Sequence, residues 1–221
     1  MIRLIRIKGP AGGPAVVSIC LVTPGGPSHG PGRLSARERA ILAGRTTAGA
    51  KADFAAGRTA AHTLLGSGVE VLRAVDGRPI PSRDGRGMRG LSLSIGHSHG
   101  FGMAALVSDE RWVVGVDIET RSSLTERLTR RILTAREKRR VARRPSRQRG
   151  RAAIEHWVLK EASLKTTGGG VAKLISAPGA AEVIRLSRRG WGRVTLSGVH
   201  PARVRLIQAR GLTMAVVLRR R

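Results

Sequence analysis

Aromatic residues are nearly absent from this chain: Phe and Trp together make up 2% of its 221 residues, and Tyr does not occur. The 41% of hydrophobic residues therefore come mainly from Ala, Val, Leu and Ile, which suffice for the interior of one sizeable domain or of two small ones that share a core. The scarcity of aromatic side chains also argues against a surface on which nucleic-acid bases stack.

Cysteine and long apolar runs are scarce too. Cys20 is the single cysteine, which excludes an internal disulfide and any zinc site built on several cysteines. No apolar run approaches the roughly 20 residues of a membrane-spanning helix. The N-terminal stretch "MIRLIRIKGPAGGPAVVSICLVT" has basic residues before an apolar run, but Ser18 interrupts that run and no cleavage pattern follows. We expect two short strands there instead of a signal peptide, in a cytoplasmic protein without a membrane partner.

Acidic residues are few: the chain has 14 Asp and Glu against 41 Lys and Arg, a formal net charge of +27 at pH 7. Most of the basic residues are Arg, since Lys occurs only at positions 8, 51, 138, 160, 165 and 173. Codon bias explains such a charge, and so does a polyanionic partner, which would be a nucleic acid, a phosphorylated cofactor or an acidic protein. Charge alone does not choose among these.

Helices and strands are expected in both halves of the chain. Ser35 followed by Glu38 has the spacing of a capping box at the start of a helix. Further helices are expected over about 47–65, within 123–141 and over roughly 151–166, and a long basic loop over 76–90. Alternating apolar patterns predict strands over 69–75, 91–98, 102–108, 112–119, 193–199, 202–209 and 212–218.

The few acids are placed unusually. Asp117 and Glu119 are one residue apart in a strand, so they share a face about 7 Å apart and repel each other unless a positive charge lies near. Glu161 falls on the apolar stripe of a helix, where Lys165 one turn later provides a partner that needs no ligand. Taken together, the three carboxylates suit a hard cation such as Mg²⁺, whereas zinc is disfavoured because no His or Cys accompanies them.

Two of these segments resemble the paired signature of the 4′-phosphopantetheinyl transferases. "GVDIE" at 115–119 is similar to their Gly-(Val/Ile)-Asp-x-Glu, and "WVLKEASLK" at 157–165 to their Trp-x-x-Lys-Glu-(Ala/Ser)-x-x-Lys, at comparable separation. Other segments resemble motifs of this family in the right order: "FAAGRTAAHTLL" (54–65), "DGRP" (76–79), "LSIGHSHG" (93–100) and "LTAREKRRV" (133–141). The resemblance covers about residues 33–175.

This resemblance implies an α+β fold of two similar lobes, a pseudo-dimer in which each lobe is a small antiparallel sheet packed with a long helix. The length of the chain and its two-half layout favour the monomeric, surfactin-synthetase-type branch over the short trimeric carrier-protein synthases. We expect an N-terminal lobe over residues 1–108 that contacts the nucleotide of coenzyme A. The C-terminal lobe over 109–221 would hold the Mg²⁺-binding acids and the Trp-x-x-Lys-Glu helix.

The resemblance further implies transfer of 4′-phosphopantetheine from coenzyme A to a serine of an acyl or peptidyl carrier protein. Mg²⁺ would be held by Asp117, Glu119 and Glu161, with Glu161 also the candidate base for the serine. Lys165 would stabilise the departing 3′,5′-ADP, and Lys160 would lie near the same phosphates. The remaining nucleotide contacts would come from Arg58, Arg78, Gly96 and His97.

Two positions depart from the family pattern: Gly96 stands where Ser is usual, and His62 where a second Arg often follows Arg58. Both bear on cofactor affinity more than on the reaction.

Other functions compete with this interpretation. The net charge and the Arg-Gly segment at 83–90 support a nucleic-acid-binding protein, although no nucleic-acid motif occurs. A relative that binds coenzyme A or a carrier protein without turnover is a third candidate. The basic run 136–151 is either a solvated face or a surface that steers acidic carrier proteins.

Overall fold

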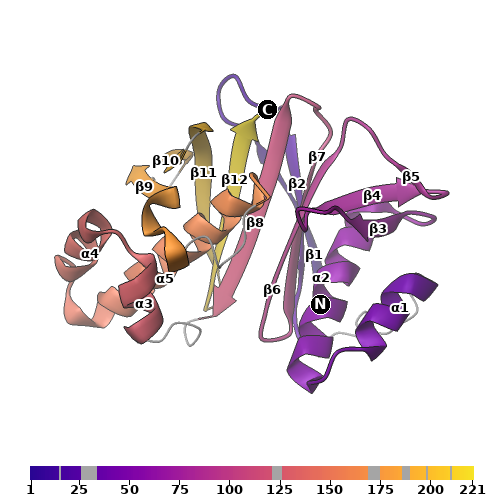
Figure 1. Ribbon diagram of the computed structural model, residues 1–221, viewed down its shortest axis with the longest axis horizontal. Helices are drawn as coiled ribbons and strands as arrows, with labels where there is room; N and C mark the ends of the chain where they lie inside the picture. Colours follow the sequence, from indigo (N-terminus) through magenta and orange to yellow (C-terminus); the bar gives the residue numbers. More distant parts are fainter. Residues whose placement is uncertain are drawn as a thin grey trace. The chain divides into compact units, whose positions relative to one another are not determined.

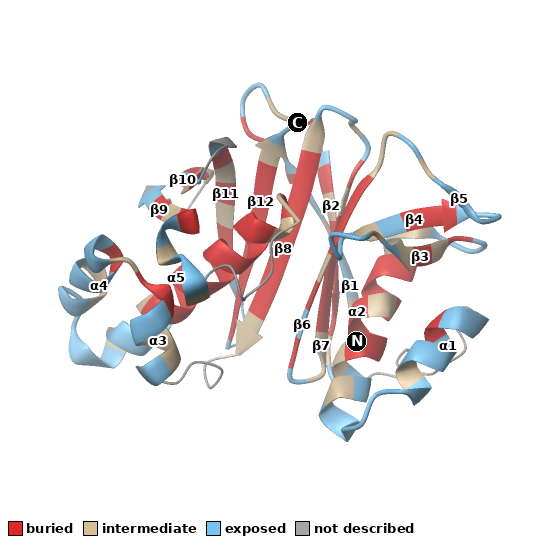
Figure 2. Cartoon of the chain, in the orientation of Figure 1, coloured by how far each residue is buried: buried red, intermediate tan, exposed pale blue. Residues whose placement is uncertain are grey.

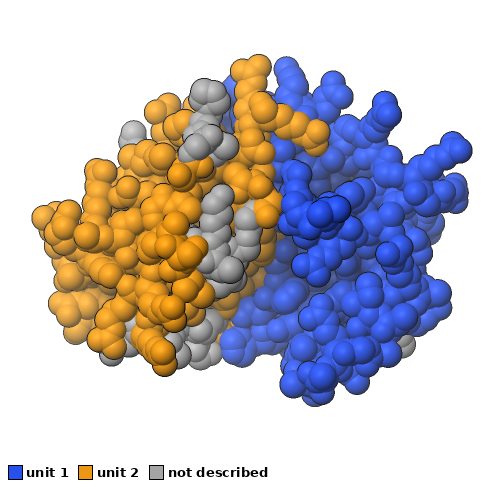
Figure 3. Space-filling view, in the orientation of Figure 1, with its two compact units in different colours: residues 1–114 blue, residues 115–221 orange. Residues whose placement is uncertain are grey.

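The computed structural model describes residues 1–14, 16–25, 34–120, 126–168, 175–185, 190–197, 199–209 and 211–221. The chain divides into two compact units, Met1–Val114 and Gly115–Arg221 (Figure 3). Each unit combines an antiparallel sheet with one long helix, which confirms the expected α+β class. The expected boundary after residue 108 and the division of roles between the lobes stay predictions.

The N-terminal unit contains a four-stranded antiparallel sheet in the order β1-β2-β7-β6 (Figure 1). Its strands are β1 (Ile2–Lys8), β2 (Val16–Val22), β6 (Ser92–Ser98) and β7 (Phe101–Val107). β1 and β2 pair from Ile2 opposite Val22 to Lys8 opposite Val16, which confirms the two N-terminal strands expected from the sequence. Cys20 of β2 is a buried free thiol.

An alanine-rich helix covers this sheet. α2 (Ala48–Leu65) packs on β2, β6 and β7, and its buried face includes Ala56 and Ala60. The small side chains let the helix approach so closely that a Cβ added at Gly102 of β7 would lie 2.2 Å from the carbonyl oxygen of Ala56. Close packing of the helix backbone on the sheet therefore fills the interior that aromatic side chains would otherwise fill.

The short helix α1 (Ala36–Ala43) begins as the sequence predicts. Ser35 Oγ accepts a hydrogen bond from the Glu38 amide at 3.2 Å, and Glu38 Oε2 accepts one from the Ser35 amide at 3.0 Å. The same Glu38 oxygen lies 2.7 Å from His62 Nε2 on α2. One carboxylate thus caps α1 and ties it to the neighbouring helix.

The expected loop over residues 76–90 is wrong in part, because this segment forms two strands. β3 (Glu70–Arg73), β4 (Pro79–Arg83) and β5 (Arg86–Gly87) make a three-stranded antiparallel sheet. Asp84 and Gly85 connect β4 to β5 with φ angles of 51° and 74°, the geometry of a two-residue hairpin turn. The prolines of the segment argued against a strand, but the Asp-Gly pair was the stronger signal.

The C-terminal unit carries a five-stranded antiparallel sheet in the order β8-β12-β11-β10-β9. Its strands are β8 (Trp112–Thr120), β9 (Ala181–Arg185), β10 (Gly192–Leu196), β11 (Val199–Ala209) and β12 (Leu212–Arg220). The boundary between the units falls within β8. All of the expected C-terminal strands form and lie in this unit, whereas β9 and the preceding 3₁₀ turn η3 (Pro178–Ala180) were not anticipated.

Three helices accompany this sheet: α3 (Glu126–Ile132), α4 (Ala135–Ala142) and α5 (Ser146–Lys165). α5 begins at Ser146, directly after Pro145 and five residues before the expected position 151. The basic segment after this proline therefore belongs to the helix, and proline is common at the start of helices. Figure 2 shows α5 buried over most of its length, and every residue from Ala153 to Leu164 is buried. Among the described helices, none has the length and apolarity to cross a membrane.

Candidate functional site

The two signature segments meet where α5 lies against β8. Gly115 begins the "GVDIE" segment, and a Cβ added there would lie 1.9 Å from the carbonyl oxygen of Ala162 on α5. A glycine is therefore required for the helix to approach this strand. The close approach brings the acids of β8 next to Glu161 and Lys165 of α5.

Lys165 pairs with the strand and not with its helical neighbour. Its Nζ donates to Asp117 Oδ1 at 2.8 Å and to the carbonyl oxygen of Val116 at 2.9 Å. The alternative in which Lys165 neutralises Glu161 is thus not what the structure shows. Asp117 is 6% exposed and Glu161 7%, and buried Asp117 Oδ2 and Glu161 Oε1 have no hydrogen-bond partner among the described residues. Two buried carboxylates therefore share the charge of one lysine.

The surroundings of these two carboxylates disfavour their ionised forms. Burial is the largest cause and raises the pKa of Glu161 to about 7, with a further contribution from the negative charge of Asp117. Burial also raises the pKa of Asp117 to about 6, against the opposing effect of Lys165 and with the charge of Glu119 adding to the rise. A cation between the two carboxylates would take the place of these protons.

Glu119 has a different environment. Its Oε1 accepts a hydrogen bond of 3.1 Å from Trp157 Nε1, and Trp157 lies in the hydrophobic core. Within the described residues, no three His, Cys, Asp or Glu side chains are grouped closely enough to hold a metal ion. The structure thus brings Asp117, Glu161 and Lys165 together and leaves Glu119 at the edge of the cluster.

The raised pKa values predict how Glu161 affects stability in metal-free buffer. In the folded state Glu161 holds a proton that the unfolded state releases above its ordinary value of 4.5, so stability is lost as the pH rises through about 7. We expect Glu161→Gln to remove this loss and to be more stable than the wild type by up to about 3 kcal/mol near pH 8.

Urea unfolding in EDTA at a series of pH values measures this difference. The advantage of Glu161→Gln should grow as the pH rises from about 5 to about 8. Glu110→Gln, which removes an exposed acid, should show no such trend. A difference that stays constant across this range would contradict the assignment of a raised pKa to Glu161.

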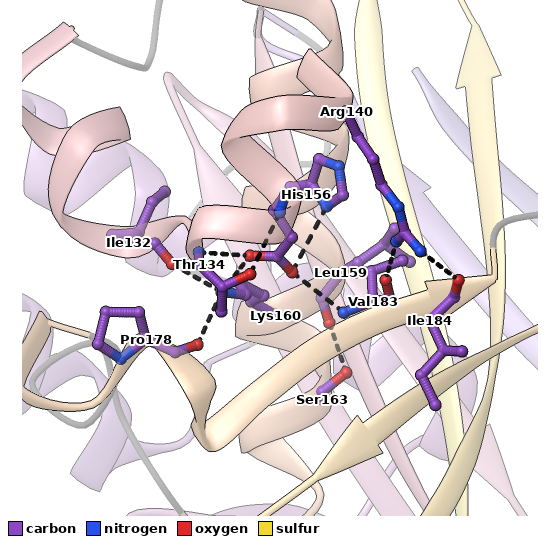
Figure 4. A network of polar contacts seen from close by, with 11 residues as sticks. Ile132, Thr134, Arg140, His156, Leu159, Lys160, Ser163, Pro178, Val183 and Ile184 are labelled. Atoms are coloured by element: carbon purple, nitrogen blue, oxygen red, sulfur yellow. Dashed lines mark hydrogen bonds and ion pairs between the residues drawn. The ribbon is translucent and has the colours of Figure 1, made fainter. Parts of the chain in front are cut away.

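Lys160 lies elsewhere. It is fully buried, its Nζ lies 2.7 Å from Glu137 Oε2, and it donates to the carbonyl oxygens of Ile132 at 2.6 Å and Pro178 at 2.8 Å (Figure 4). Every donor of this ammonium group is used. In the structure Lys160 joins α5 to α4, and its contact with the phosphates of coenzyme A stays a prediction.

Glu137 is the residue whose importance the sequence reasoning missed. Its Oε1 accepts from the Val183 amide at 3.0 Å, and its Oε2 accepts from the Thr134 amide at 2.9 Å. Thr134 Oγ1 in turn accepts from the Glu137 amide, so the pair forms a capping box. The Thr-x-x-Glu spacing in the sequence was the available signal for this role.

The expected nucleotide-binding residues of the N-terminal unit have separate partners. Arg58 is largely buried, 3.6 Å from Glu38 Oε1, and donates to the Val71 carbonyl oxygen at 3.2 Å. Arg78 donates to Asp76 Oδ2 at 2.7 Å.

His97 and Gly96 both lie on β6. The His97 side chain is 46% exposed, with Nδ1 3.9 Å from Asp53 Oδ2. Gly96 is buried and pairs with Met103. Gly57 of α2 lies against the same strand, since a Cβ there would be 2.9 Å from Ile95 Cγ2 and 3.5 Å from His97 Cδ2. Close helix–strand contact thus joins two of the resembling segments.

Comparison with known proteins connects this geometry to a family. Residues 113–217 match the 4′-phosphopantetheinyl transferase superfamily. The chain is also 32% identical over 130 residues to the 4′-phosphopantetheinyl transferase HetI of Nostoc sp., an alignment that covers 55% of this chain and 54% of the relative. The chain thus spans about half the length of the curated relative it matches. The superfamily match contains the whole cluster of Asp117, Glu161 and Lys165.

Proposed function

Because residues 113–217 carry the sequence pattern of the 4′-phosphopantetheinyl transferase superfamily, we propose that this protein is such a transferase. It moves the 4′-phosphopantetheine group from coenzyme A to a serine of an acyl or peptidyl carrier protein and releases 3′,5′-ADP. The observation that carries the proposal is the buried pair Asp117 and Glu161 beside Lys165, each with one oxygen that has no partner in the described part of the chain. The length and the two-unit layout favour the monomeric surfactin-synthetase-type branch.

The donor set of this cluster fits Mg²⁺. Mg²⁺ takes oxygen ligands and is commonly held by one or two carboxylates together with substrate phosphates. Asp117 and Glu161 supply two such carboxylates with unpartnered oxygens, and Glu119 is the candidate for a third. Bound there, the ion would neutralise charge on the pyrophosphate of coenzyme A.

The remaining chemistry falls to side chains of this chain. The serine hydroxyl of the carrier attacks the β-phosphorus, the bond from that phosphorus to the oxygen of 3′,5′-ADP breaks, and the serine loses its proton. The carboxylate of Glu161 is the candidate acceptor for that proton, directly or through water. The Lys165 ammonium stabilises the negative charge on the departing 3′,5′-ADP.

The N-terminal unit is proposed to bind the nucleotide. His97 and Arg78 are the two exposed residues among its candidates. Arg58 and Gly96 complete the expected set. The net charge of +27 suits both coenzyme A and an acidic carrier protein as partners, and the free buried thiol suits the cytoplasm.

A reconstitution experiment tests the function. The protein is mixed with an apo carrier protein, coenzyme A and Mg²⁺, and the carrier is weighed by mass spectrometry. We expect the mass of the phosphopantetheine group to be added, EDTA to abolish the addition, and excess Mg²⁺ to restore it. Salt-sensitive nucleic-acid binding without transfer would favour the nucleic-acid-binding alternative. Binding of coenzyme A or of the carrier protein without transfer would indicate a non-catalytic relative.

A further inference from the structure

A pocket of about 490 Å³ lies in the C-terminal unit between α4, α5 and β9. Arg140, Arg143 and Arg144 line it together with His156 of α5, and Val183 and Ile184 of β9 form part of its apolar lining. None of the residues assigned above to coenzyme A, the metal or the carrier serine belongs to this lining. We propose that this pocket is a second anion site, which binds a phosphate dianion, either free or as part of a small phosphorylated molecule.

Arg143 and Arg144 carry positive charges that no described acidic side chain neutralises. Both side chains are exposed. The acid in the lining, Glu155, is already engaged, because its Oε1 accepts from Gln208 Nε2 at 2.5 Å and lies 3.5 Å from Arg151 Nε. Two guanidinium groups that face a common pocket suit a phosphate, which they bind with paired hydrogen bonds.

The inner wall of the pocket is built in advance of any ligand. Arg140 donates from Nη1 to the Val183 carbonyl oxygen and from Nη2 to that of Ile184 at 2.9 Å, so its charge is fixed against β9 (Figure 4). Such fixed donors lose little conformational entropy when an anion binds.

His156 of α5 forms part of the lining. Its side chain is about nine-tenths buried, and its Nδ1 lies 3.7 Å from Glu137 Oε1 and has no hydrogen-bond partner among the described residues. Burial is the main cause that lowers the pKa of His156 to about 4, so the ring is neutral near pH 7 and carries one N–H. Nδ1 faces the Glu137 carboxylate, so His156 shapes the lining and the arginines supply the hydrogen bonds to the anion.

Isothermal titration calorimetry of the full chain tests the site, with inorganic phosphate and glycerol 3-phosphate as the two probes and without coenzyme A. We expect Arg143→Gln/Arg144→Gln to weaken binding by about a hundredfold or more, because two charged hydrogen-bond donors to the phosphate are lost. The matched control Arg139→Gln/Arg147→Gln removes the same charge from exposed positions of α4 and α5 outside the lining, and should change the affinity by less than about twofold.

The outcomes separate this site from the transferase site. Tighter binding of glycerol 3-phosphate than of phosphate identifies a phosphorylated molecule as the ligand, and equal binding identifies free phosphate. Asp117→Asn should bind both probes as the wild type does, so the result holds whether or not the protein transfers phosphopantetheine. Equal losses in the two double variants, or no binding by the wild type, would overturn the proposal.

Discussion

Asp117→Asn and Glu161→Gln are each expected to lower the rate of carrier modification by about three orders of magnitude. Both substitutions keep the shape of the side chain and remove the negative charge on which the proposed Mg²⁺ site depends. Loss of a proton acceptor alone costs about 10²–10⁴ in rate, and loss of charge stabilisation of the phosphates costs a similar factor. The measurement is kcat/KM for coenzyme A, followed by mass spectrometry of the carrier at saturating Mg²⁺.

The controls separate chemistry from folding. Glu161→Gln removes the energetic penalty of a buried charge, so its unfolding midpoint should be at or above that of the wild type. Asp117→Asn also removes the partner of Lys165, so its rate is compared at a temperature at which its unfolding curve shows it folded. Glu110→Gln should be fully active. Glu119→Gln keeps an oxygen that accepts from Trp157, so any loss of rate in this variant reports its charge and not the hydrogen bond. Wild-type rates in both Asp117→Asn and Glu161→Gln would refute the metal assignment.

The parts of the fold that local patterns determine were predictable from the sequence. The Ser35 capping box, the Ala-rich helix α2 and the alternating strands β6 to β8 form as expected, since spacing and periodicity fix them locally. The Asp84-Gly85 turn was also a local signal, within a segment expected to be a loop. β9 was not predictable in the same way, because its short segment is defined by pairing with β10.

Partners within the candidate site were less predictable than its members. Helical spacing places Lys165 equally well for Glu161, and only the approach of β8 gives its ammonium to Asp117. Lys160 and Glu161 are adjacent in the sequence, yet Lys160 uses its donors on Glu137, Ile132 and Pro178, whereas one oxygen of Glu161 has no partner among the described residues. Such choices depend on which element packs against each face of α5, and sequence periodicity does not contain that information.

Lys160→Met is expected to destabilise the protein by about 3–5 kcal/mol, because it leaves the carboxylate of Glu137 buried without its cation. Glu137→Gln should cost a similar amount, since it leaves the Lys160 ammonium unpaired. The double variant Lys160→Met/Glu137→Gln leaves no uncompensated charge, so we expect it to recover much of either loss. Urea unfolding measures all three, with Lys138→Met on the exposed face of α4 as the control.

The double variant also decides what Lys160 does in the proposed reaction. If Lys160 only joins α5 to α4, restoring stability should restore the rate of transfer as well. If Lys160 also reaches a phosphate of coenzyme A in the working enzyme, the double variant should be stable but have a raised KM for coenzyme A. The fully used donors of the ammonium group favour the first result. Losses in the two single variants that simply add up in the double variant would show that Lys160 and Glu137 do not act as a pair, and would contradict the structural role argued from their contact.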